Sequence, residues 1–102
     1  MGIDLKHEDE NGHQLAELSD PQSLVAWFLP QSGMQDSHCL RYIDHYGNTV
    51  FNQLQIPQLI AELEKLPTHP HKPEADQHLE AVLEFIRKTQ DETHTYIKFY
   101  GD

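Results

Sequence analysis

Histidine is the residue type that most invites a chemical interpretation of this sequence. Eight of the 102 residues are histidines, and His69 and His71 flank Pro70 in the tightest cluster. Alternate positions of an extended segment can reach one ion, but a stable site needs further ligands that are held rigidly. The other histidines show no spacing typical of zinc sites. We therefore expect no metal and no other cofactor, and interpret these histidines as solvated loop residues; an unperturbed imidazole titrates at about pH 6.5.

Cys39 is the single cysteine and the obvious candidate for a nucleophile. A nucleophilic thiol needs a neighbouring base, and adjacent residues of a strand point to opposite faces, which places His38 badly. No glycine-rich turn offers an oxyanion site, and the phosphate-binding patterns GxxxxGKS/T and GxGxxG are absent. Pairs of carboxylates such as Glu62 with Glu64 arise by chance in a chain rich in acids. We therefore predict a buried core cysteine and no enzyme activity.

Negative charge is the strongest signal of the chain. The 17 Asp and Glu residues outnumber the 7 Lys and Arg residues and give a formal net charge of −10. Such a charge disfavours binding to nucleic acid or to an anionic membrane and favours a cationic partner. Asp76, Glu80 and Glu84 recur every four residues, an arrangement that costs helix stability unless a cation faces it. We predict that these three carboxylates bind a partner; an ordinary solvated helix face is the alternative.

A second candidate surface combines tyrosines with carboxylates. Tyrosine offers a large contact area and a hydrogen-bonding tip at small entropic cost, which suits an interface. Asp44 and Tyr46 lie in a predicted turn, and Tyr100 and Asp102 lie at the end of the sequence. We rank Tyr46 and Tyr100 above Tyr42 as exposed anchors, because turns and chain ends are rarely buried. These four residues complete the predicted partner-binding set.

Two amphipathic helices must position the acidic side chains. Apolar residues at helical spacing predict one helix over residues 57–66 and a second over residues 74–89. Asp20 followed by Pro21 indicates the start of a shorter helix, which ends before Pro30. Residues 31–37 and 66–72 are predicted to be loops, because proline and glycine interrupt them.

Strand-forming segments alternate with these helices. Asn11 and Gly12 suit a tight turn, so residues 3–6 and 14–18 are predicted to form a weak hairpin; a flexible lead-in over residues 1–20 is the alternative. Residues 39–43 and 49–51 are predicted to be a second hairpin, and residues 95–100 a last strand. Together they predict one α+β domain over residues 1–102. We expect a small antiparallel or mixed sheet with two or three helices packed on one face.

The compartment can also be inferred from the sequence. A single cysteine excludes an intrachain disulfide, which agrees with a reducing compartment. Residues 1–10 are acidic and lack the apolar run of a secretory signal. No segment approaches the roughly 20 apolar residues of a membrane-spanning helix. We therefore expect a cytoplasmic protein.

Two segments of the sequence resemble a pattern that is known from other proteins. RYIDHYGNTVFNQLQIPQLIAELEKL (residues 41–66) and HTYIKFYGD (residues 94–102) resemble a pattern found in small bacterial proteins. By its size, acidity and α+β order, the chain also resembles the immunity proteins of contact-dependent growth inhibition and related polymorphic toxin systems. Because immunity proteins differ widely in fold, this resemblance implies neutralisation of one cognate toxin and transfers no catalytic residues.

The function that we predict is capture of a cationic protein. Toxins that cut nucleic acid carry basic clefts, and an acidic protein can block such a cleft while electrostatic steering speeds the encounter. An immunity protein that binds a cognate basic toxin domain, such as a nuclease, is therefore the leading hypothesis. A small regulatory or adaptor subunit of a larger complex is the first alternative, and a small metal-dependent or hydrolytic enzyme is the second. The sequence does not fix the oligomeric state.

Overall fold

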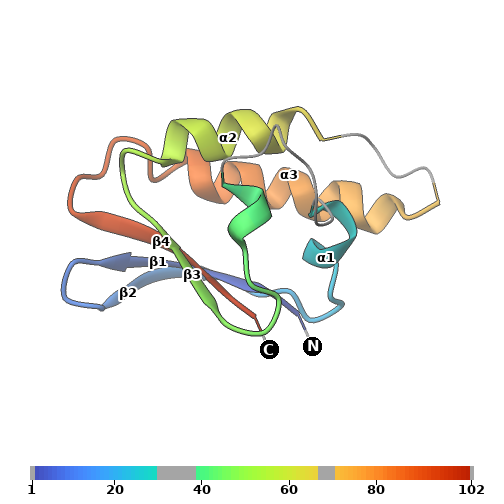
Figure 1. Cartoon of the computed structure of the whole chain (residues 1–102), viewed down its shortest axis with the longest axis horizontal. Helices are drawn as coiled ribbons and strands as arrows, with labels where there is room; N and C mark the ends of the chain where they lie inside the picture. Colours follow the sequence, from blue (N-terminus) through green and yellow to red (C-terminus); the bar gives the residue numbers. More distant parts are fainter. Residues whose placement is uncertain (1, 30–38, 67–70, 102) are drawn as a thin grey trace.

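A four-stranded antiparallel sheet underlies the fold. The computed structural model describes residues 2–29, 39–66 and 71–101. The strands are β1 (Asp4–Asp9), β2 (Gln14–Leu18), β3 (Asn48–Phe51) and β4 (Thr95–Tyr100). They follow the order β2-β1-β4-β3, so the first and last strands of the chain are neighbours in the middle of the sheet (Figure 1).

The predicted N-terminal hairpin is confirmed. β1 pairs with β2, and Gly12 takes a φ of 83° in the connecting turn, a conformation that glycine adopts without the steric cost of a side chain. The Asp9 carboxylate supports the same turn by accepting hydrogen bonds from the backbone N–H groups of Asn11 at 2.9 Å and His13 at 2.8 Å. Between His7 and Glu8 the register shifts by one residue, which leaves Leu15 without an opposite partner on β1.

The helices pack on one face of this sheet (Figure 1). They are α1 (Val25–Phe28), α2 (Ile56–Glu64) and α3 (Pro73–Arg87), so both predicted amphipathic helices are confirmed. The expected α+β class is confirmed as well, with an antiparallel sheet. Helix periodicity predicted α2 and α3 because each buries one apolar side against the sheet.

The core lies between the two layers. Alternate residues of the central strands, among them Leu5, Ile97 and Phe99, face the helices and are almost fully buried. Phe51 of β3 meets Phe99 edge to face, with 5.7 Å between the ring centres. The helices contribute their buried positions to the same cluster: Val25, Phe28, Ile56, Leu59, Ile60, Leu63, Leu79, Val82, Leu83 and Ile86. This shared core fixes the position of α3 relative to the sheet.

The predicted strand over residues 39–43 is wrong. Leu40–Tyr42 forms a short 3-10 helix instead. The carboxylate of Glu62 accepts hydrogen bonds from the backbone N–H groups of Cys39, at 3.0 Å, and Leu40, at 3.1 Å, so a distant side chain satisfies donors that a strand would have used. The second predicted hairpin therefore does not form, and β3 pairs with β4.

The predicted helix start at Pro21 is also wrong, because α1 begins four residues later at Val25. Asp20 still caps the helix as expected, but it accepts hydrogen bonds from residues that lie further along the chain. Its carboxylate accepts hydrogen bonds from the backbone N–H groups of Leu24, at 2.6 Å, and Val25, at 3.1 Å. Residues 31–37 lie outside the described part of the chain, as do residues 67–70 of the second predicted loop.

Candidate functional site

A groove between α2 and α3 contains two of the predicted partner-binding residues. Its volume is about 260 Å³, and Asp76 and Glu80 of α3 line it. Its remaining lining residues are leucines and one further carboxylate: Leu63, Glu64, Leu66, Leu79 and Leu83. The groove therefore has an apolar floor and an acidic edge.

The sequence of α3 produces this combination directly. Leu79 and Leu83 are four residues apart, as are Asp76 and Glu80, so each pair is stacked on one side of the helix. The leucines are buried towards α2, while Glu80 is exposed. Asp76 lies in the first turn of α3, where the helix dipole favours a negative charge. The helix dipole thus offsets part of the cost of holding Asp76 in this turn.

The carboxylates on the two sides of the groove differ in whether a neighbouring cation pairs with them. On the α2 side, Glu64 accepts a 2.8 Å hydrogen bond from Arg87, which neutralises its charge. On the α3 side, the Glu80 carboxylate makes no hydrogen bond or ion pair with any other described residue. Among the described residues that line the groove, Glu80 therefore has the carboxylate that is open to a partner.

Glu84 lies outside this groove. Its side chain is 72% exposed and sits 3.7 Å from Lys88, one turn further along α3. The predicted acidic stripe is therefore divided: Asp76 and Glu80 line the groove, whereas Glu84 pairs with a cation of its own helix. A surface pair of this kind contributes little stability.

The structure brings Asp44, Tyr46 and Tyr100 close to one another at the other side of the molecule. The backbone N–H of Gly101 donates a 2.7 Å hydrogen bond to the carbonyl of Gly47, which ties the end of β4 to the turn that contains Tyr46. This turn lies beside the sheet layer, away from the groove between the helices (Figure 1). The two predicted surfaces are therefore separate.

Tyr46 and Tyr100 differ greatly in exposure. Tyr46 is 84% exposed, and its backbone N–H is held by the Asp44 carboxylate at 2.9 Å. Tyr100 is partly buried, whereas Tyr42 is 66% exposed. The expected rank of the tyrosines thus holds for Tyr46 and is wrong for Tyr100. Asp102 lies outside the described residues.

A charged network on the open sheet face explains why Tyr100 is covered. Its hydroxyl donates a 2.7 Å hydrogen bond to Glu8, and the ammonium groups of Lys6 and Lys98 lie 4.5 Å and 5.2 Å from its ring centre. Lys98 also lies 3.3 Å from Glu8. Hydrogen bonds to Tyr100 and Glu8 raise the pKa of Lys98, so its ammonium stays charged. Tyr100 is already engaged and is a weaker candidate anchor than Tyr46.

Cys39 lacks the environment of a nucleophile. The residue is buried, and burial together with the negative charge of Glu62 raises the pKa of its thiol to about 11. The predicted buried cysteine is confirmed. At neutral pH the sulfur is therefore a protonated thiol, whereas nucleophilic attack requires the thiolate.

Sequence reasoning missed the burial of two polar side chains, Asp20 and His7. Asp20 is 1% exposed, and its carboxylate lies 3.7 Å from Nε2 of His78 on α3. His7 is 6% exposed on the helix-facing side of β1, where the alternation of the strand would place an apolar residue. The one sequence feature that indicated its burial is that His7 continues the alternation of the apolar residues Ile3 and Leu5.

The described residues contain neither a metal-binding cluster nor a membrane-spanning helix. Within residues 2–29, 39–66 and 71–101, no three His, Cys, Asp or Glu side chains are grouped so as to hold a metal ion, and His69 lies outside those ranges. None of the described helices has the length and apolar character needed to cross a bilayer. A scan against protein-family models found no match, and neither did searches of the curated proteins and of the solved structures.

Proposed function

We propose that this protein is a cytoplasmic, non-enzymatic binding protein, and specifically an immunity protein that neutralises a cognate basic toxin domain. The groove between α2 and α3 is the docking site in this proposal. The observation that supports it is the pairing of an apolar floor with the carboxylates of Asp76 and Glu80. An amphipathic segment with Lys or Arg beside an apolar side chain complements both features.

The overall charge supports the same partner. A net charge of −10 steers a cationic protein towards this surface and repels nucleic acid and anionic lipid. Exposed Tyr46 offers a second, separate contact for a large partner. Charge alone does not give tight binding, so the leucines of the groove supply the desolvated centre that a stable complex needs.

The test begins with the neighbouring gene. We expect the gene immediately upstream to encode a large secreted protein with a basic C-terminal domain. That domain, purified, is mixed with this protein in a stopped-flow experiment at several salt concentrations. Reversing the charge at Asp76 and Glu80 together should slow association about tenfold at low salt and reduce its salt dependence. Expression of this protein should also relieve the toxicity of the domain in cells.

Two control variants sharpen this test. Glu84→Lys changes the same helix by the same charge but lies outside the groove, so its effect should be clearly smaller than that of Glu80→Lys. Asp91→Lys repeats the charge change in the turn after α3. Equal effects of all these variants would show that only net charge matters and would remove the groove from the interface. A toxic domain that this protein neither binds nor relieves would contradict the proposed function.

An adaptor subunit is the second candidate, and exposed apolar side chains near β3 favour it. Leu54 is 88% exposed and Val50 is 47% exposed. A partner that covers this edge of the sheet would bury both. Light scattering after size-exclusion chromatography tests self-association: an apparent mass that rises with concentration, and that Leu54→Ser returns to the monomer value, supports this candidate. A monomer mass at every concentration counts against self-association.

A further inference from the structure

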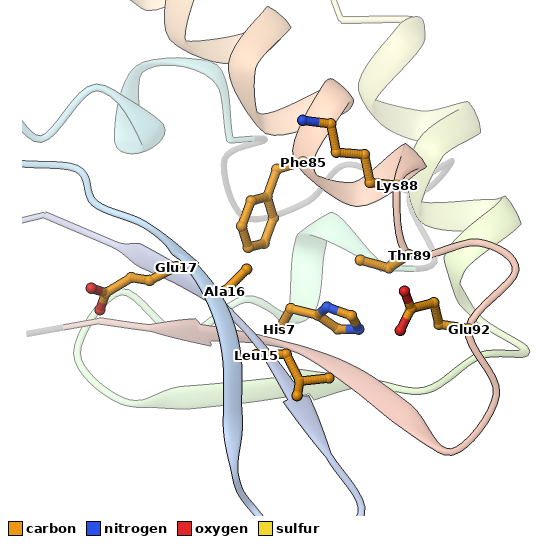
Figure 2. A pocket seen from close by; sticks show the side chains of 8 residues that line it. All are labelled: His7, Leu15, Ala16, Glu17, Phe85, Lys88, Thr89 and Glu92. Carbon is orange, nitrogen blue, oxygen red and sulfur yellow. The ribbon is translucent and has the colours of Figure 1, made fainter.

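A second pocket lies at the other end of α3, beside the edge strand β2. Its volume is about 550 Å³, and it is lined by His7, Leu15 and Ala16 from the strands and by Phe85, Thr89 and Glu92 from α3 and the following turn. Figure 2 shows these side chains around a space between the two layers. Every residue of β2 is exposed or half-buried, so the helix layer leaves this strand largely uncovered.

His7 gives this pocket an unmet hydrogen-bonding group. Its side chain comes from the helix-facing side of β1, and its Nε2 atom is buried with no hydrogen-bond partner in the part of the chain that the structure describes. Buried polar side-chain atoms are nearly always hydrogen-bonded in folded proteins, because losing water without a replacement is unfavourable. A ligand in the pocket can supply the missing partner.

Glu92 provides a carboxylate opposite this imidazole. In Figure 2 the His7 ring and the Glu92 carboxylate point towards one another across the pocket. The backbone of Glu92 is fixed by two hydrogen bonds, from its own N–H to the carbonyl of Thr89 at 3.1 Å and from the Thr95 hydroxyl to its carbonyl at 2.9 Å. The Glu92 carboxylate makes no ion pair with any other described residue.

No other described side chain of the pocket hydrogen-bonds to Nε2 of His7. The Thr89 hydroxyl donates its hydrogen to the carbonyl of Ile86 at 2.7 Å. The ammonium of Lys88 points away from His7 and Glu92 in Figure 2 and lies 3.7 Å from Glu84. Glu17 adds a second carboxylate at the strand side, 3.7 Å from Lys6. The space between His7 and Glu92 is thus bordered by the Glu92 carboxylate, by the unpaired Nε2 of His7 and by apolar walls.

We infer that the pocket of His7 and Glu92 binds a guanidinium or ammonium group that is carried on an apolar stem. Such a group has several N–H donors, so it can donate at once to the Glu92 carboxylate and to Nε2 of His7, which accepts a hydrogen bond in the tautomer that carries its proton on Nδ1. Leu15, Ala16 and Phe85 contact the stem. An anion is disfavoured by the Glu92 carboxylate, because the Glu17 carboxylate points away from this space and pairs with Lys6 (Figure 2). This site lies outside the groove between α2 and α3, and its existence does not depend on the proposed function.

The experiment uses n-butylguanidinium as the probe and records the His7 ring and the amides of β2 by NMR in the whole protein. We expect saturable binding that n-butylurea, an uncharged molecule of the same shape, does not reproduce. Glu92→Gln should weaken binding about tenfold, because it removes the counter-ion of the guanidinium. The matched control Asp91→Asn removes a carboxylate from the same turn but not from the pocket, and should change affinity less than about twofold.

His7→Phe keeps an aromatic ring but removes the acceptor, and it should also weaken binding about tenfold. If this variant does not fold, Glu92→Gln and the urea control still decide the question. Failure of n-butylguanidinium to saturate, or equal affinity in wild type and Glu92→Gln, would overturn the inference. Glu80→Lys should leave binding of the probe unchanged, so this test separates the pocket from the proposed toxin-binding groove.

A second experiment tests whether the bound guanidinium or ammonium group belongs to a protein or to a small molecule. An extended peptide with a single arginine between apolar residues is compared with the same peptide carrying citrulline. Tighter binding than n-butylguanidinium, with slowed amide exchange along β2, assigns the group to a side chain of a protein strand that pairs with the open edge of the sheet. Affinity equal to that of the small probe, without this protection, assigns it to a small molecule. Binding that citrulline does not weaken would contradict a charged ligand.

Discussion

Nε2 of His78, on α3, lies 3.7 Å from Oδ1 of Asp20, in the segment that precedes α1. The Asp20 side chain is fully buried, and it also accepts hydrogen bonds from three backbone N–H groups, those of Ile3, Leu24 and Val25. Through these hydrogen bonds one carboxylate joins the start of β1 to the start of α1. It lies beside His78 of α3 without a hydrogen bond to that ring.

Asp20→Asn should therefore destabilise the fold. The substitution replaces an acceptor oxygen by an amide that donates, so at least one buried backbone N–H faces another donor. We expect a loss of about 2 to 4 kcal/mol in the free energy of unfolding, measured with urea. Asp44→Asn is the control, because it keeps the oxygen that accepts from Tyr46 at an exposed turn; its effect should stay within about 0.5 kcal/mol. Equal effects would contradict the role of Asp20.

Cys39 should react slowly with iodoacetamide. The native thiol has a pKa of about 11, against 9.0 for an unperturbed cysteine. At pH 8 the native protein therefore contains about a hundredfold less thiolate than the unfolded chain. The measurement compares alkylation rates in buffer and in urea. Rapid alkylation of the native protein would mean that the thiol is neither buried nor influenced by Glu62.

The same pKa shift makes stability depend on pH in a defined direction. The unfolded chain loses the Cys39 proton above pH 9.0, while the folded protein keeps it up to about pH 11. The contribution of this group is therefore complete below pH 9.0 and is lost as the pH rises through about 11. In urea unfolding between pH 8 and 11, the stability of wild type should fall faster than that of Cys39→Ala. Parallel curves would contradict this linkage.

Asp9 should titrate below its ordinary pKa. Hydrogen bonds from the backbone N–H groups of His13 and Asn11 lower the pKa of this carboxyl from 3.8, with a smaller effect from the charge of the His13 ring. The stabilisation is therefore present above pH 3.8 and is lost as the pH falls through the lowered value. In an NMR titration the amides of Asn11 and His13 should move together below pH 3.8. Asp9→Asn should abolish that movement.

Tyr46 and Tyr100 should respond differently to substitution. Tyr46→Ala removes a side chain that is 84% exposed, so we expect the free energy of unfolding to change by less than about 0.5 kcal/mol. Tyr100→Phe removes the 2.7 Å hydrogen bond to Glu8 and should cost about 1 kcal/mol. If Tyr46 contacts the proposed partner, Tyr46→Ala will weaken binding without altering stability. The reverse pattern would place Tyr46 in the folded core network.

Local patterns were sufficient to predict most elements of this fold. α2 and α3 follow from the spacing of their leucines, and the β1–β2 hairpin follows from Asn11-Gly12. The segment around Cys39 was not predictable in this way. Its 3-10 helix depends on the carboxylate of Glu62, which lies 23 residues away along the chain. Sequence spacing contains no information about a contact of that range.

The candidate site could likewise be predicted from local spacing only in part. Helical spacing placed Asp76 and Glu80 together, but only the packing of α2 against α3 gives them an apolar floor. The i,i+4 spacing of Glu84 and Lys88 predicts their pairing, which the structure confirms, and Glu84 lies outside the groove. The unmet Nε2 of His7 depends on the helix layer stopping short of β2, which no pattern in either element indicates.

The central place of β4 has a consequence for how the chain reaches its native state. β1 and β3 are held together only through β4, whose residues 95–100 are separated from β1 by most of the sequence. During synthesis, an emerging chain can form the β1–β2 hairpin and α2. β3 cannot join the sheet until Thr95–Tyr100 leave the ribosome. The sheet is therefore completed only after β4 has left the ribosome, and nascent chains halted before Thr95 should remain accessible to proteases.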